Sequence, residues 1–349
     1  MKELFQILTL PLKGREGQGE EDYRNSRNLA FSKVVKPLLA IVLSLGIALA
    51  GCSSQPSSNQ EMVLKIGVLP IVDTLPMYVA ELEGYNRERN LAVELVLFPS
   101  ALERDSAFVA GQVDGVLNDP VAAALLNKDG EKAKIVRLAF KGNPSMAMMV
   151  VLASPNSRIQ SPLDLKGVPI GISRNSVIEY TTDRLLQSAG LELAEIEKTE
   201  VSKMPVRAEM LTKDQLSAAT LPEPLASLAQ LQGARRVIDD SKTGTGQSLI
   251  TMHQRVVTEN PDLLRRFLAS YEEAVETINV SPNKYRDLMV DKAKVPDELK
   301  TSFDVPQFDK GQLPSRADVE DVIQWMVEKK LLDNPIPYDD LVADGLLPE

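Results

Sequence analysis

Short runs of apolar residues alternate with longer segments of helical spacing from residue 63 onward. The run LKIGVL at 64–69 predicts a strand, and residues 77–82 predict a helix that follows it. Between them lie Asp73 and Thr74, which are residue types that often begin helices. In open α/β sheets, ligands bind where strands end and helices begin, so this loop is the first place to expect a bound molecule.

The same alternation continues along the chain and predicts mainly parallel α/β sheets. Further strands are predicted at 92–98, 113–117, 135–139, 146–153, 168–172, 216–220, 236–238 and 247–253. Further helices are predicted at 102–110, 121–127, 176–189, 205–211 and 225–231, and after Asn260 and Ser315.

One segment is echoed later in the chain. GQVDGVLNDP at 111–120 resembles DQLSAATLPEP at 214–224, which has one extra residue. Each reads as a strand, then an acidic residue and a proline, then a helix. Apart from a chance likeness, the echo predicts two similar lobes that each place a carboxylate, Asp119 or Glu223, at the end of a strand.

The N-terminal part has the pattern of a lipoprotein signal. Basic residues precede an apolar run at 37–50, which is too short to span a bilayer comfortably. Leu49-Ala50-Gly51-Cys52 resembles a lipobox, and the polar tract SSQPSSNQ follows it. We therefore expect residues 1–51 to be a signal peptide with an atypical N-terminal extension, and 52–62 to be a lipidated Cys52 with a flexible linker. The alternative for Cys52 is a buried free thiol.

The net charge and the residue counts argue against several kinds of partner and reaction. The 349 residues carry a net charge of −10, which argues against nucleic acid as a partner. Cys52 is the only cysteine, so the chain after it has no thiol for a disulfide, a nucleophile or a zinc ligand. His253 is the only histidine, and in its expected strand it is more typical of packing than of binding. The chain contains no P-loop, G-x-S-x-G or H-E-x-x-H motif.

Several phrases, in this order and spacing, resemble a known family over residues 63–349. They are LKIGVLP with DTLPMYVAELEGYNRERNLAVELV, AGQVDGVLND, SPLDLKGVPIGIS, LPEP, ENPDLLRRFLASYEEAVETIN and YDDLVADGLLP. Together they resemble the type II periplasmic binding proteins of ABC importers, in the nitrate, sulfonate, taurine and thiamine-precursor group.

The resemblance implies two α/β lobes, each a mainly parallel sheet flanked by helices, joined by two hinge strands and closing on a small molecule. We expect the first lobe at 63–147 plus 252–349 and the second at 150–250. The implied protein is a monomeric, lipid-anchored binding protein on the extracytoplasmic face of the cell membrane. It would use no cofactor or metal, would not be an enzyme, and would deliver its ligand to an ABC permease and ATPase.

Ligand contacts are expected from loop residues at strand ends. The candidates are Asp73, Thr74, Asn118, Asp119 and Asn143 in the first lobe, and Ser173, Arg174, Asn175, Ser176 and Glu223 in the second. Several could instead only cap helices, and Ser176 with Glu179 has the spacing of a capping box. Lys141 is more typical of a solvated loop, and Tyr180 of a partly buried helix position.

The charge of the ligand stays open at this point. Helix N-termini with Ser173 and Arg174 would suit a sulfonate, nitrate or carboxylate. Asp73, Asp119, Glu179 and Glu223 favour a ligand with a cationic or hydrogen-bond-donating part. Three other roles remain: a lipoprotein that binds ligand for sensing, an enzyme on the same fold such as a relative of thiamine-pyrimidine synthases, and a structural or adhesive lipoprotein.

Overall fold

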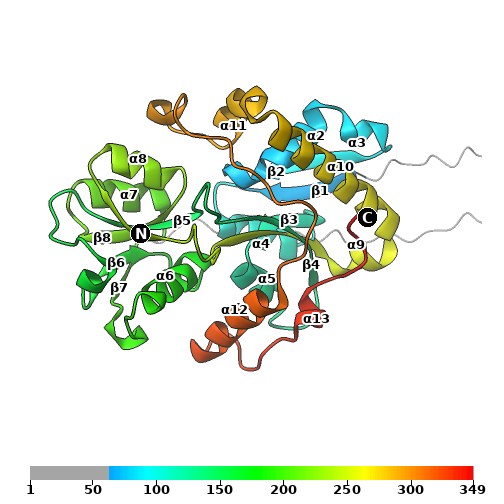
Figure 1. The fold of residues 1–349 in the computed structure, drawn as a ribbon. Coiled ribbons are helices and arrows are strands. Elements are labelled where there is room, and N and C mark those ends of the chain that lie inside the picture. Colours follow the sequence, from blue (N-terminus) through cyan, green and yellow to red (C-terminus); the bar gives the residue numbers. More distant parts are fainter. Residues whose placement is uncertain (1–62, 349) are drawn as a thin grey trace, which may run out of the picture. The chain divides into compact units, whose positions relative to one another are not determined.

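The computed structural model describes residues 63–348. Residues Glu61–Glu349 form one compact unit, which Figure 1 shows as a ribbon. The predicted signal peptide, lipidated Cys52 and linker lie outside the described residues. Within the described part, no helix is both long and apolar enough to cross a membrane.

The first lobe is built on a five-stranded sheet with the order β2-β1-β3-β10-β4. Only β10 runs antiparallel to its neighbours, so the sheet is mainly parallel, as predicted. Its strands are β1 (Val63–Val68), β2 (Ala92–Leu97), β3 (Gly115–Asn118), β4 (Ala133–Lys141) and β10 (Gln247–His253).

Helices cover both faces of this sheet. On one face, α2 and α10 bury their apolar sides against β1 and β10. On the other face, α4, α5 and α12 bury theirs against β3, β4 and β10. The regular helices of this lobe are α2 (Leu75–Leu82), α3 (Tyr85–Glu88), α4 (Ala101–Val109), α5 (Pro120–Leu126), α9 (Gln254–Glu259), α10 (Pro261–Val280), α11 (Arg286–Lys292), α12 (Arg316–Glu328) and α13 (Tyr338–Leu341). Short 3-10 turns are η1 (Val72–Thr74), η4 (Pro282–Tyr285) and η5 (Asp297–Leu299).

The second lobe repeats this plan with the strand order β7-β6-β8-β5-β9. Its strands are β5 (Met149–Ala153), β6 (Ile170–Ile172), β7 (Lys198–Glu200), β8 (Ala218–Pro222) and β9 (Arg235–Asp239). Its helices are α6 (Val177–Ser188), α7 (Met204–Thr212) and α8 (Leu225–Leu231), with 3-10 turns η2 (Pro162–Leu165) and η3 (Leu193–Glu195).

Side-chain alternation along β5 builds two cores in this lobe. Met149, Val151 and Ala153 face α6, whereas Val150 and Leu152 face α7 and α8. Successive side chains of a strand point to opposite faces, so a strand covered on both sides is apolar throughout. This is why the run around residues 149–153 has no polar member.

The echo found in the sequence is a structural repeat. Helices α4 and α7 each have nine residues, and each is followed by a residue in the left-handed region, Gly111 (φ 69°) and Asp214 (φ 56°). Strands β3 and β8 come next, then α5 and α8. The prediction of two similar lobes is therefore confirmed, and Asp119 and Glu223 follow equivalent strands.

The chain passes between the lobes twice, from β4 to β5 and from β9 to β10 (Figure 1). Asp240, which follows β9, joins the two passages. Its fully buried carboxylate accepts hydrogen bonds from Met148 and Met149 in one passage and from Gly246 in the other, over 2.8 to 3.0 Å. The strand predicted at 247–253 is β10 and belongs to the first sheet.

Helix α6 of the second lobe also packs directly on the first lobe. Tyr180 of α6 enters the first-lobe core beside Val121 and makes an edge contact with Trp325 of α12 at 5.5 Å between ring centroids. Its hydroxyl donates to Asp321 at 2.6 Å, and Arg184 donates to both oxygens of the same carboxylate. Tyr180 is thus a core residue, as the sequence suggested, but in the core of the other lobe.

Candidate ligand-binding site

Asp73 and Thr74 lie in η1, directly after β1. Both are buried, and the Thr74 hydroxyl donates to the Ile71 carbonyl at 2.6 Å, so Thr74 completes its own turn and does not cap α2. Asp73 Oδ2 has no hydrogen-bond partner among the described residues. Burial raises the pKa of the Asp73 carboxyl to about 6, an effect that the neighbouring Ser248 hydroxyl partly offsets.

Asn118 and Asp119 lie at the end of β3. Asp119 caps α5 by accepting from the Ala122 N–H at 3.0 Å, as the sequence predicted. Burial raises its pKa to about 6. The Asn118 side chain accepts from the Thr251 hydroxyl at 2.7 Å, while its buried Nδ2 has no partner in the described part of the chain.

Ser173 to Ser176 form the loop between β6 and α6. Ser176 caps α6 by accepting from the Ile178 N–H at 3.2 Å, but no capping box forms. Instead Glu179 accepts from the Asn175 N–H at 2.7 Å, and Glu200 accepts from the Arg174 N–H at 2.7 Å. The predicted capping box is wrong because the Glu179 carboxylate, although at the right spacing, bonds the Asn175 N–H instead of the Ser176 N–H and joins a buried charge network with Lys198 and Lys329.

Glu223 and Asn143 occupy turns near the passages between the lobes. Glu223 accepts from the Ser227 N–H at 3.0 Å and pairs with Arg236 at 3.2 Å, and burial raises its pKa. Its own N–H donates to the Met148 carbonyl, which places it beside the first passage. The Asn143 side chain accepts from the Ser145 and Met146 N–H groups and so serves its own turn.

These loops come from both lobes and converge on the surface that the lobes share. Helices α5 and α6, which Asp119 and Ser176 begin, contact each other. Leu228 of α8 and Met148 pack on the first-lobe core that contains Val72 of η1. The Asp240 carboxylate is near enough to Asp73 to raise its pKa. The strand ends therefore meet around the hinge.

Sequence reasoning missed several residues of this region. Asp240 and Ser248 lie at the hinge beside Asp73, and Arg207 of α7 lies under the loop at Ser173. Asp240 follows a short predicted strand, and Arg207 lies inside a predicted helix, where arginine is usually solvated. The structural repeat supplies a signal, because Arg207 is the counterpart of Arg104, which reaches the end of β3 by donating to the Leu117 carbonyl at 2.7 Å.

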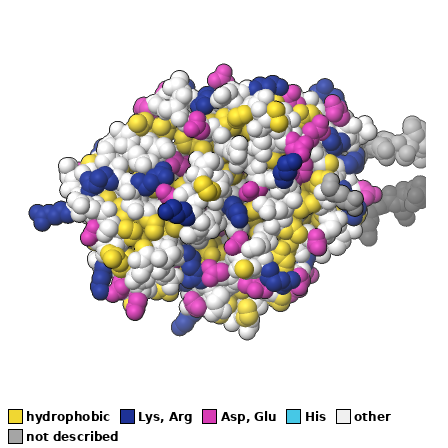
Figure 2. All heavy atoms as spheres, in the orientation of Figure 1, with side chains coloured by type: hydrophobic (Ala, Val, Ile, Leu, Met, Phe, Trp, Pro, Cys, Tyr) yellow, Lys and Arg dark blue, Asp and Glu magenta, His cyan; other side chains and the backbone are white. Residues whose placement is uncertain are grey.

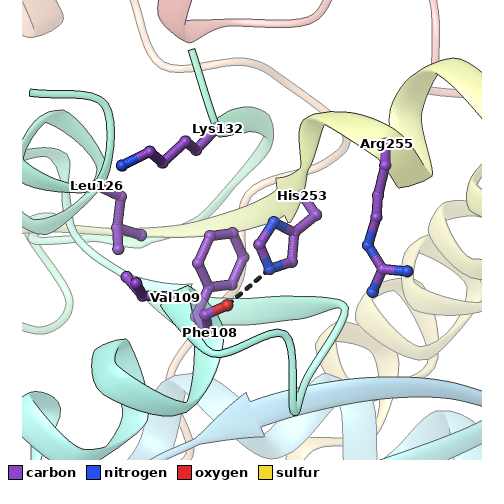
Figure 3. Close-up of a pocket in the computed structure, with 6 residues that line it drawn as sticks. All are labelled: Phe108, Val109, Leu126, Lys132, His253 and Arg255. Atoms are coloured by element: carbon purple, nitrogen blue, oxygen red, sulfur yellow. Dashed lines mark hydrogen bonds between the residues drawn. The ribbon is translucent and has the colours of Figure 1, made fainter. Parts of the chain in front are cut away.

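A pocket of about 340 Å³ lies elsewhere on the first lobe. Figure 3 shows its lining, with the rings of Phe108 and His253 stacked at 3.8 Å and the His253 ring bonded to the Phe108 carbonyl. His253 is the last residue of β10, at the opposite end of that strand from Gln247, so this pocket is separate from the hinge. The histidine packs, as the sequence indicated.

Neither the face drawn in Figure 2 nor the carboxylates of the described residues indicate a strongly charged patch or a metal site. Basic and acidic side chains are interspersed over the face shown in Figure 2. Within residues 63–348, no group of His, Asp and Glu side chains is placed to hold a metal ion.

Two mainly parallel sheets, two passages and strand ends that meet at the hinge define the periplasmic-binding-protein class of fold. Solved structures share it. The aliphatic sulphonate-binding protein SsuA from Escherichia coli superposes with a TM-score of 0.68 at 20% identity, over 82% of this chain and 94% of that one. The desulfurization enzyme DSZB has a TM-score of 0.64 at 15% identity, over 81% and 97% of the chains.

The model of the family described as NMT1/THI5 like matches residues 72–284. The chain therefore belongs to this family, and the resemblance to nitrate-, sulfonate- and taurine-type binding proteins is confirmed. Among curated proteins, a putative aliphatic sulfonates-binding protein of Escherichia coli K12 is 25% identical over 249 residues, covering 69% of this chain and 73% of the relative.

Proposed function

We propose that this protein is an extracytoplasmic solute-binding lipoprotein that captures a small molecule between its lobes and delivers it to an ABC permease and ATPase. The observation that carries the proposal is the convergence of both lobes' strand ends at the hinge, where Asp73 Oδ2 and Asn118 Nδ2 are buried and have no partner within residues 63–348. Leaving such groups unpaired is costly, so they favour a role in binding.

The proposed site consists of the loop residues predicted from the sequence. These are Asp73, Thr74, Asn118, Asp119, Asn143, Ser173, Arg174, Asn175, Ser176 and Glu223. Thr74 and Asn143 contribute to the proposed site by holding the shape of their loops, since the side chain of each forms a hydrogen bond within its own turn. The proposed lobe limits of 63–147 plus 252–349 and 150–250 change at one point, because β10 (Gln247–His253) lies in the first sheet and assigns residues 247–250 to the first lobe. Cys52 is proposed as the lipidated residue, and the chain is proposed to act as a monomer.

A thermal-shift screen of the fragment from Glu61 tests this function, since that fragment forms one compact unit. The panel contains nitrate, taurine, alkanesulfonates, aminopyrimidines, riboflavin and amino acids. A ligand at 100 times its Kd should add about 2.7 kcal/mol to the free energy of unfolding. Glu223→Gln and Asp119→Asn should weaken binding while the protein stays folded. No shift with any compound, or normal binding by both variants, would contradict the function or the site.

Import is favoured over sensing because one solved structure of the same fold is described as the ligand binding component of an ABC-type import system from Staphylococcus aureus. Co-purification of the full chain with a permease would support import, and co-purification with a receptor would support sensing. Replacing Cys52 with Ser should move the protein from the membrane fraction to the soluble fraction.

A further inference from the structure

The first lobe presents a buried acid without a counter-ion at the hinge. Asp73 is 3% exposed, and within residues 63–348 no lysine or arginine forms an ion pair with it. The Ser248 hydroxyl and the Asp240 carboxylate both lie near enough to affect its pKa, and burial together with the Asp73 charge raises the pKa of the Tyr271 hydroxyl. Asp240 is itself held by three backbone N–H groups, so it does not supply a donor to Asp73. Asp73 Oδ2 therefore offers an unused acceptor.

The second lobe presents the opposite charge at the equivalent strand. Arg207 is fully buried and donates through Nη1 to Ser173 Oγ at 3.0 Å and to the Val201 carbonyl at 3.1 Å. Its Nε and Nη2 have no partner among the described residues. Glu200 is the nearest acid, but its carboxylate is taken up by the Arg174 N–H and the Ser202 hydroxyl.

The repeat shows that the two lobes differ in the charge partner of this arginine. Arg104 occupies the counterpart position in the first lobe and packs under Gly67 as Arg207 packs under Gly171. Arg104 Nη2 is also without a partner among the described residues, but Arg104 forms an ion pair with Asp105 at 2.8 Å, whereas Arg207 forms none within residues 63–348. An isolated buried guanidinium is costly, so the imbalance calls for an anionic or acceptor group that arrives from outside.

From these contacts we infer that the ligand is bipolar and is held in one orientation, with a cationic or N–H-donating end against Asp73 of the first lobe and an anionic or acceptor end against Ser173 and Arg207 of the second. The inference rests on the proposed function and adds the ligand's chemical class. Arg207 also positions Ser173 by donating to its Oγ, while the Ser173 hydroxyl donates to the Ser202 carbonyl at 3.3 Å. Nε and Nη2 of Arg207, which have no partner among the described residues, are therefore the donors available to the ligand.

Matched ligands test the inference on the unaltered fragment from Glu61. Taurine carries both ends, ethanesulfonate lacks the amine and ethylamine lacks the sulfonate. β-Alanine, propionate and ethylamine form the equivalent carboxylate set. We expect at least one bipolar compound to bind about tenfold to a hundredfold more tightly than either of its one-ended analogues in calorimetry, since each end makes a charge-assisted hydrogen bond.

Variants assign the ends to the lobes. Asp73→Asn should abolish the advantage of the amine-bearing ligand, so that taurine binds no better than ethanesulfonate. Arg207→Gln should abolish the advantage of the anionic end. Arg235→Gln is the matched control. Arg235 also donates to backbone carbonyls, those of Pro155, Ser157 and Ile159, but it lies at the end of the second lobe away from the hinge.

The outcomes separate the inference from the function. Ethanesulfonate or nitrate binding as tightly as any bipolar compound overturns the inference while supporting a solute-binding role. If Asp73→Asn still prefers taurine to ethanesulfonate, the assigned orientation is overturned. If that variant does not fold, the ligand series on the unaltered fragment still tests whether the ligand is bipolar. Absence of binding by every compound in the broad panel contradicts the proposed function itself.

Discussion

The Asp240 carboxylate, on the second passage between the lobes, accepts a hydrogen bond from the Met148 N–H on the first passage at 2.8 Å. One buried side chain thus fixes the spacing of the two strands about which the lobes would turn. Two glycines make room for it. A Cβ at Gly246 would lie 2.5 Å from Asp240 Oδ2, and one at Gly142 would lie 2.7 Å from the carboxylate carbon.

Replacing Gly246 with Ala should lower the free energy of unfolding by about 1 to 3 kcal/mol, because the new methyl overlaps a buried carboxylate that cannot move freely. Urea denaturation of the fragment from Glu61 measures this. Lys242→Ala, an exposed change in the same segment, should have little effect. Equal stability of the Gly246 variant and the parent would show that Asp240 is not held tightly.

Stability should depend on pH through the buried carboxyls. Burial raises the pKa of Asp119 to about 6, above its ordinary value near 4. The folded state therefore favours the protonated form, and the associated stability is present below about pH 4 and lost as the pH rises through 6. Asp73 and Asp240, whose pKa values are also about 6, act in the same direction.

Asp119→Asn keeps a helix cap but cannot ionise. Its free energy of unfolding relative to the parent should rise between pH 4 and pH 7, by up to about 3 kcal/mol. Denaturation curves at several pH values give this difference. The exposed change Asp129→Asn should show no such trend, and a difference for Asp119→Asn that stays flat with pH would be inconsistent with its burial.

Tyr180→Phe should loosen the contact between the lobes. The variant loses the hydroxyl bond to the Asp321 carboxylate, which should cost about 1.5 to 3 kcal/mol of stability. Small-angle scattering should show a larger radius of gyration without ligand. Tyr338→Phe is a matched control, because its hydroxyl bonds the Pro314 carbonyl within one lobe. Equal radii for both variants would argue that the α6–α12 contact does not govern closure.

Gly111→Ala should destabilise the first lobe by about 1 kcal/mol, since φ at this position is 69° and an L side chain is strained there. Beyond the two chain neighbours, no atom of the described residues lies within 4 Å of the added methyl, so the effect is purely conformational. Gly111→Asn should cost less, because asparagine tolerates this region. Thermal unfolding compares the two, and equal melting temperatures for the parent and the Ala variant would contradict the strained geometry.

The sequence predicted the elements and the repeat because both rest on local patterns. Apolar runs with two-residue or helical spacing define β1, α10 and α12, and Asp119 before a proline signals its cap. The hinge cluster could not be predicted in this way. Asp240 acts on residues 148 and 149, which are distant in sequence, and the role of Arg207 depends on its burial rather than on its neighbours.

The Ser176 capping box shows how a local rule fails. The spacing to Glu179 fits the motif, yet Glu179 is fully buried and also accepts from Lys329, which directly follows α12, at 2.7 Å. The ion pair with Lys329 therefore determines where the Glu179 side chain points. Its second carboxylate oxygen accepts a hydrogen bond from the Asn175 N–H in the loop.

Glu179 thus connects a lysine near the end of α12 with the backbone of the loop at Asn175. A mutation at Lys329 would remove one donor from the carboxylate that also holds the Asn175 N–H. The position of this loop, and with it the rate at which a ligand leaves the proposed site, should therefore respond to a residue that is not itself part of that site.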